Sequence, residues 1–96
     1  LLLKKKNLPK ENIRTVKSRR ASCYYKLKDY HSAYKDITEA ILFSKPKAAV
    51  EDYILRINCE IELSKKEKAK KTIEIALRHY PQHQELLKLA KGMESI

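Results

Sequence analysis

The sequence predicts an all-α protein, and three features of the chain support this prediction. Lys, Glu, Leu, Ile and Ala are abundant, whereas the 96 residues include one glycine and three prolines, so helix formers dominate. Apolar residues recur at helical spacing in five blocks. The blocks are separated by short breaks that contain Pro, Ser, Asn or Asp. Part of this pattern also repeats along the chain. Since a chain of this length has room for one hydrophobic core, a large substrate cavity is not expected.

The first two blocks predict a helix hairpin. They cover residues 13–27 and 31–44, and Pro46 prevents the second helix from continuing. The expected core positions are Ile13, Val16, Ala21, Cys23, Tyr24, Leu27, Ala33, Ile37, Ala40, Ile41 and Phe43.

The next two blocks, residues 48–63 and 67–80, predict a second hairpin that ends before Pro81. Their expected core positions are Val50, Tyr53, Ile54, Ile57, Ile61, Leu63, Ala69, Ile73, Ala76, Leu77 and Tyr80. The fifth block, residues 83–96, carries an apolar stripe of Leu86, Leu89, Ala90 and Met93. It is expected to form a terminal capping helix.

The two hairpins repeat each other at a spacing of 36 residues. Ala33, Ile37 and Ala40 recur as Ala69, Ile73 and Ala76, Cys23 recurs as Cys59, and Leu27 recurs as Leu63. A fixed internal period is typical of stacked structural repeats. The three recurring positions lie on one helix face, where alanine allows a neighbouring helix to approach closely.

These residues resemble the tetratricopeptide repeat (TPR) family, whose helix pairs of about 34 residues carry Trp, Leu, Gly, Tyr, Ala, Phe, Ala and Pro at set positions. The matching residues of the first pair are Lys17, Arg20, Ala21, Tyr24, Ala33, Ile37, Ala40 and, displaced by one, Pro46. Those of the second pair are Tyr53, Arg56, Ile57, Glu60, Ala69, Ile73, Ala76 and Pro81. The second-helix half of each pair matches well, whereas the first-helix half lacks the tryptophan and the glycine. The resemblance implies an α-solenoid of antiparallel helix pairs with about five helices.

The resemblance also divides the chain into four parts. Residues 1–12 are expected to be a basic segment from the end of a preceding repeat, residues 13–46 and 47–81 the two helix pairs, and residues 82–96 the capping helix. Since about three repeats are normally needed for a stable solenoid, we expect further repeats upstream in a longer protein, or self-association through exposed repeat ends.

The sequence predicts no enzyme activity and no cofactor. Cys23 and Cys59 occupy equivalent repeat positions, which favours core packing, and the lack of CxxC pairs favours a reducing compartment without a disulfide. His79 and His83 have the spacing of a helical metal pair, but Pro81 between them prevents one helix from presenting both. No apolar run is long enough to cross a bilayer, so we expect a cytoplasmic protein, with the nucleus as the alternative.

The resemblance implies that the first helices of the pairs line a concave groove that binds extended peptides. The expected groove residues are Arg19, Ser22, Tyr25, Lys26, Glu51, Leu55, Asn58 and Lys88, with Thr15, Ser18, Glu62, Gln84 and Lys91 beside them. The expected function is a non-catalytic scaffold that binds a peptide or partner domain. Because Arg19 and Lys26 form a basic lip, an acidic partner is favoured.

Two alternative functions stay open. One TPR subclass, the co-chaperones, binds the C-terminal carboxylate of heat-shock chaperone tails through Asn, Lys and Arg, but the matching positions hold Arg19, Glu51 and Leu55. The other alternative is nucleic acid, because the net charge is +10 and residues 1–28 hold ten Lys or Arg against Glu11 alone. Its candidate contacts are Lys4, Lys5, Lys6, Lys10, Arg14, Lys17, Arg19 and Arg20.

Overall fold

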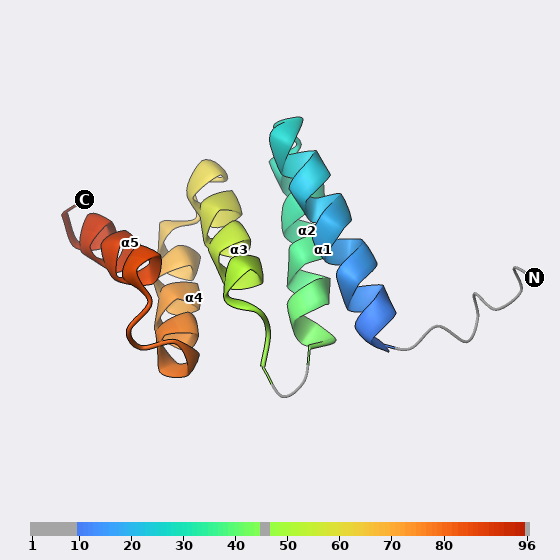
Figure 1. Ribbon diagram of the computed structural model, residues 1–96. Coiled ribbons are helices and arrows are strands. Elements are labelled where there is room, and N and C mark those ends of the chain that lie inside the picture. The colour runs from blue at the N-terminus through green and yellow to red at the C-terminus, as the bar shows by residue number, and fades with distance from the viewer. Residues whose placement is uncertain (1–9, 45–46, 96) are drawn as a thin grey trace, which may run out of the picture.

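The computed structural model describes residues 10–44 and 47–95, and these residues form five α-helices without a strand. The helices are α1 (Lys10–Lys26), α2 (Tyr30–Leu42), α3 (Val50–Glu62), α4 (Lys66–His79) and α5 (Gln84–Ser95). They follow one another along an elongated body of 53 × 28 × 18 Å (Figure 1). Over these residues, the predicted all-α fold of antiparallel helix pairs with five helices is confirmed. None of the helices in this part of the chain combines the length and the apolarity that a bilayer span requires.

The helix bounds agree with the predicted blocks to within two residues, except at the start of the first helix. Helix α1 begins at Lys10, so residues 10–12 belong to the first helix rather than to a separate basic segment. Three of the candidate nucleic-acid contacts, Lys4, Lys5 and Lys6, lie outside the described residues, as does the predicted helix stop Pro46.

The turns inside the two hairpins have the same geometry. Lys28 and Ser64, which are 36 residues apart, both have a left-handed backbone, with φ of 65° and 61°. In the first turn, the amide of Asp29 donates to the carbonyl of Tyr24 at 2.9 Å, and in the second the amide of Lys65 donates to the carbonyl of Glu60 at 2.7 Å. This is the Schellman arrangement that satisfies the last carbonyls of a helix. The 36-residue period of the sequence is therefore also present in the backbone geometry of the two turns.

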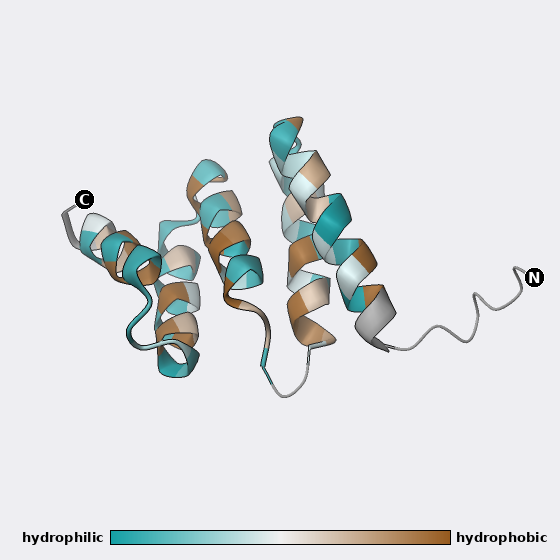
Figure 2. Cartoon of the chain, in the orientation of Figure 1, coloured by the Kyte–Doolittle hydropathy of each residue, from teal (hydrophilic) through white to brown (hydrophobic). Residues whose placement is uncertain are grey.

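The helices pack in two layers. Helix α1 packs along α2, α3 along α4, and α2 contacts α3 across the boundary between the pairs. In Figure 1, α1, α3 and α5 form the layer nearer the viewer, with α2 and α4 behind. Figure 2 shows polar and apolar residues interspersed along the helices. Helices α2 to α5 are clearly amphipathic, as expected when one face is buried, whereas α1 is much less so.

The repeated alanine and isoleucine positions lie in the core, as predicted. Residues that expose no more than 3% of their surface include Ala33, Ile37, Ala40, Ala69, Ile73 and Ala76. The second pair and α5 share one cluster that includes Tyr53, Ile57, Leu86 and Met93. A smaller cluster of Ala21, Ile37 and Ala40 joins α1 to α2.

Five expected core positions are wrong, because Val16, Cys23, Leu27, Phe43 and Ile61 are exposed. Leu27 exposes 76% of its surface and Val16 exposes 54%. For Val16, Cys23 and Leu27, which lie on or directly after α1, the cause is the small number of neighbouring helices. Helix α1 packs on α2 along one side and meets α3 only briefly, so the described residues leave its remaining surface uncovered.

The two cysteines show the same effect. Cys23 and Cys59 occupy equivalent repeat positions, yet Cys23 on α1 is exposed and Cys59 on α3 is fully buried. Helix α3 is covered by both α2 and α4, whereas α1 has no such second neighbour among the described residues. The prediction of core packing is confirmed for Cys59 and wrong for Cys23.

Candidate partner-binding groove

A groove opens on the layer of helices α1, α3 and α5. It is defined by eight lining residues, Ser18, Ser22, Glu51, Asp52, Ile54, Leu55, Asn58 and Glu85. The hollow has a volume of about 240 Å³. Four of the residues expected from the sequence, Ser22, Glu51, Leu55 and Asn58, are brought together here, and Ser18 lies beside them.

Helix α3 supplies most of the groove because of its residue spacing. Glu51, Ile54, Leu55 and Asn58 follow the i, i+3, i+4, i+7 pattern that places side chains on one helix face. Ile54 also packs against the core cluster of the second pair, and Leu55 packs against the cluster between α1 and α2. The apolar part of the groove is therefore continuous with the protein core.

Asp52 is the least exposed polar group in the groove, with 4% of its surface accessible. The Ser18 hydroxyl on α1 donates a hydrogen bond to its Oδ1 at 2.7 Å. No donor among the described residues reaches its other oxygen, Oδ2. Glu51 and Asp52 lie in the first turn of α3, where the positive end of the helix dipole favours carboxylates. Since Glu85 adds a third carboxylate and none of the eight described lining residues is basic, the groove carries negative charge.

The other four expected residues do not line the groove. Arg19, Lys26 and Lys88 are exposed on the surface, so the expected basic lip lies outside the hollow. Tyr25 is half-buried and meets Tyr30 edge to face, with 5.2 Å between the ring centroids. Burial raises the pKa of Tyr25 above its usual value. Tyr25 therefore has the packing role expected of the other tyrosines.

Sequence reasoning missed Asp52, Ile54 and Glu85. Ile54 fits the helical spacing of Glu51 and Asn58, so that pattern was sufficient to place it at the groove. Asp52 had no such signal, because its position depends on the contact with Ser18, which lies 34 residues earlier. Glu85 reaches the groove because of the way α5 packs on the second pair.

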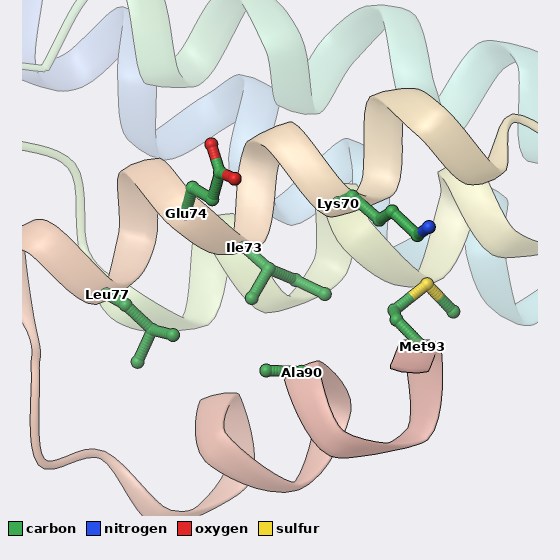
Figure 3. Close-up of a pocket in the computed structure, with 6 residues that line it drawn as sticks. All are labelled: Lys70, Ile73, Glu74, Leu77, Ala90 and Met93. Carbon is green, nitrogen blue, oxygen red and sulfur yellow. The ribbon is translucent and has the colours of Figure 1, made fainter. Parts of the chain in front are cut away.

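A second hollow of about 250 Å³ lies between α4 and α5 (Figure 3). Its lining residues are Lys70, Ile73, Glu74, Leu77, Ala90 and Met93. In Figure 3, Ile73 and Leu77 of α4 point toward the side of α5 that carries Ala90 and Met93. With Lys70 and Glu74 as its polar members, this hollow presents an apolar surface and no cluster of reactive groups.

The described histidines, cysteines and carboxylates form no metal-binding cluster. Within residues 10–44 and 47–95, no three His, Cys, Asp or Glu side chains approach closely enough to hold a metal ion. His79 instead stacks on Tyr53, with 6.2 Å between the ring centroids. Burial raises the pKa of the Cys59 thiol to about 11, so at neutral pH this cysteine is protonated and a poor nucleophile.

Two of the basic residues considered for nucleic acid already have partners on α2. Lys17 lies 2.8 Å from Glu39, and the Arg20 guanidinium donates to both oxygens of Asp36 at 2.6 and 2.9 Å. Such pairing reduces the positive charge that α1 presents to an anionic partner. Arg19 stays exposed on the same helix.

No model of a known protein family matches the chain, and comparisons with curated proteins and with solved structures found no match either. The TPR resemblance therefore stays a prediction that rests on the residues of this sequence.

Proposed function

We propose that the chain is a non-catalytic interaction module that binds an extended peptide of a partner protein in the groove. The observation that carries this proposal is the composition of the groove. Three successive helices of one layer, α1, α3 and α5, contribute to a single open hollow. Apolar Ile54 and Leu55 lie beside hydrogen-bonding Ser22 and Asn58. Apolar surface with a few convergent polar groups is typical of binding sites.

The charge of the groove argues against the co-chaperone type of function. A carboxylate placed beside Glu51 or Glu85 would meet like charge, and two like charges about 4 Å apart repel by about 1 kcal/mol in water and more at lower dielectric. The nucleic-acid alternative is weakened for a different reason, because Lys17 and Arg20 are engaged by Glu39 and Asp36. Both free thiols, one of them exposed, support a reducing compartment such as the cytoplasm.

The proposal is tested by selecting peptides from a displayed library of random 12-residue sequences against the whole chain. A blocking variant, Ser22→Tyr, fills the groove from an exposed position on α1. Its matched control is Cys23→Tyr, which adds the same ring at the next residue, also exposed but outside the groove. We expect selected peptides to lose at least tenfold in affinity for Ser22→Tyr and to keep their affinity for Cys23→Tyr. Equal binding to both variants would show that the groove is not the site.

A further inference from the structure

The groove concentrates negative charge in a chain of opposite overall charge. Its three carboxylates come from two helices, Glu51 and Asp52 from α3 and Glu85 from α5. The whole chain has a net charge of +10. A local field opposite in sign to that of the surrounding surface selects the charge of the group that enters it.

Asp52 supplies a second, independent observation. Although the residue exposes 4% of its surface, its Oδ2 has no hydrogen-bond partner in the described chain. Buried carboxylate oxygens are rarely left without a donor, because they have given up their contacts with water. The helix dipole explains why α3 tolerates acidic residues in its first turn, but it gives this oxygen no donor. Oδ2 is itself shielded from solvent, so a donor carried by a ligand in the groove would complete its hydrogen bonding once the carboxylate turns toward the hollow.

The apolar side chains beside these carboxylates further restrict which chemical group a ligand can place in the groove. Ile54 and Leu55 line the same hollow and suit the aliphatic stem of a long side chain. A guanidinium is planar, always charged and more weakly hydrated than an ammonium, and it carries five N–H donors. It can therefore donate to Asp52 and still face a second carboxylate.

We infer that the groove binds an arginine side chain of an extended partner peptide, with the guanidinium at Asp52 and between Glu51 and Glu85. This inference rests on the proposed function and gives it a partner class. It replaces the acidic partner that the sequence favoured, because Arg19 and Lys26 do not line the groove.

Fluorescence anisotropy with three labelled peptides tests the inference. The first peptide is Gly-Ser-Leu-Arg-Leu-Arg-Ser-Gly, the second has citrulline at both arginines, and the third has glutamate there. Citrulline keeps the shape of arginine without its charge. We expect the arginine peptide to bind the whole chain at least tenfold more tightly than either of the others. Equal affinity of the arginine and citrulline peptides would overturn the inference.

Charge-neutralising variants locate the contact. Asp52→Asn keeps an oxygen for Ser18 and removes the charge, and we expect it to weaken the arginine peptide at least tenfold. Glu85→Gln, at an exposed position, should weaken it about threefold and serves as the test if Asp52→Asn does not fold. Glu74→Gln is the matched control, since it removes the same charge from α4 outside the groove. An equal loss of affinity with Glu74→Gln would show that the effect comes from the overall charge of the chain and not from the groove. That result would overturn the inference.

Three further outcomes distinguish failure of this inference from failure of the proposed function. If the glutamate peptide binds tightly and Ser22→Tyr abolishes this binding, the arginine site is rejected and the groove is kept as a peptide-binding site. If none of the three peptides binds and the library yields no groove-dependent peptide, both proposals fail. If the chain self-associates and Glu85→Gln abolishes this self-association, a second copy of the chain occupies the groove. That result also overturns the inference.

Discussion

The hydroxyl of Tyr34 on α2 donates a hydrogen bond to the carboxylate of Glu60 on α3, with 3.0 Å between Oη and Oε2. The same carboxylate oxygen accepts from Arg56 Nε and from Thr72 Oγ1, each at 3.1 Å. Glu60 is fully buried. Since Thr72 lies on α4, three helices meet at one side chain, and the Tyr34 bond joins the first helix pair to the second.

Substitutions in this network should reduce stability by different amounts. Tyr34→Phe removes one hydrogen bond and should lower the free energy of unfolding by about 0.5–1.5 kcal/mol. Glu60→Ala leaves Arg56 without its buried partner and should cost about 3 kcal/mol. Urea unfolding followed by circular dichroism measures both. Lys35→Ala, at an exposed site beside Tyr34, is the control and should change stability by less than about 0.5 kcal/mol. If Glu60→Ala behaves like this control, the network does not stabilise the fold.

The close helix contacts at Ala33 and Ala69 make a second prediction. Both residues are completely buried, so a larger side chain has no space. Ala33→Leu and Ala69→Leu should each destabilise the chain by about 1–3 kcal/mol through overpacking. In contrast, a methyl group at Gly92 on α5 would meet no atom within 4 Å. Gly92→Ala should therefore stabilise the chain by about 1 kcal/mol, since alanine favours helix. Unchanged melting temperatures for the two leucine variants would contradict the close contacts.

The paired turns lead to a third prediction. Lys28 and Ser64 have positive φ, a conformation that strains residues with a side chain but not glycine. Lys28→Gly and Ser64→Gly should each stabilise the chain, by about 0.5–1 kcal/mol. Glycine at Lys35, inside α2, should instead destabilise by about 1 kcal/mol. Thermal unfolding of the three variants gives the signs directly, and a loss of stability with glycine at both turns would rule out turn strain.

The Arg20–Asp36 pair predicts how stability depends on pH. Hydrogen bonds from the Arg20 guanidinium hold the pKa of the Asp36 carboxyl below its usual value. The ionised carboxylate therefore stabilises the fold fully above the ordinary aspartate pKa of about 4, and this contribution is lost as pH falls through the lower folded-state pKa. Urea midpoints between pH 2 and 7 should fall more steeply below pH 4 for the native chain than for Asp36→Asn.

The exposed Glu67 provides the control for that titration. It lies 4.0 Å from Lys70 and most of its side chain is in solvent. Glu67→Gln should follow the native pH profile. A profile of Asp36→Asn that is parallel to the native one over the whole range would show that the Arg20 pair does not link protonation to folding.

The sequence predicted those features that depend on spacing along one helix. The burial of Ala33 and Ala69 and the repetition of the hairpin were predictable, because apolar periodicity determines which face of a helix is covered. Features that depend on which helix lies next to another were not predictable in this way. Leu27 and Leu63 have the same repeat position, but Leu27 is exposed because, within the described chain, α1 packs on α2 and meets α3 only briefly.

The groove shows the same division. Ser22, Leu55 and Asn58 were expected there because first-helix positions follow from the repeat, and the structure places them along one hollow. Asp52 was not expected, since its burial and its unpaired oxygen arise from a contact between α1 and α3. Spacing along the sequence identified the groove surface, whereas the packing of the helices determines which carboxylates line it.

The unequal burial of Cys23 and Cys59 is directly measurable by thiol labelling. Cys23 is exposed, whereas Cys59 is buried between helices and has its pKa raised to about 11. Because the thiolate is the reactive form, about one thiol per chain should react with a disulfide reagent at pH 8, and the second only after unfolding. Cys23→Ser should abolish the early reaction and Cys59→Ser should leave it unchanged. If Cys59 reacted as readily as Cys23 in the native chain, α3 would not be covered by α2 and α4, and neither the groove nor the polar network of Glu60 would have the support that the structure gives them.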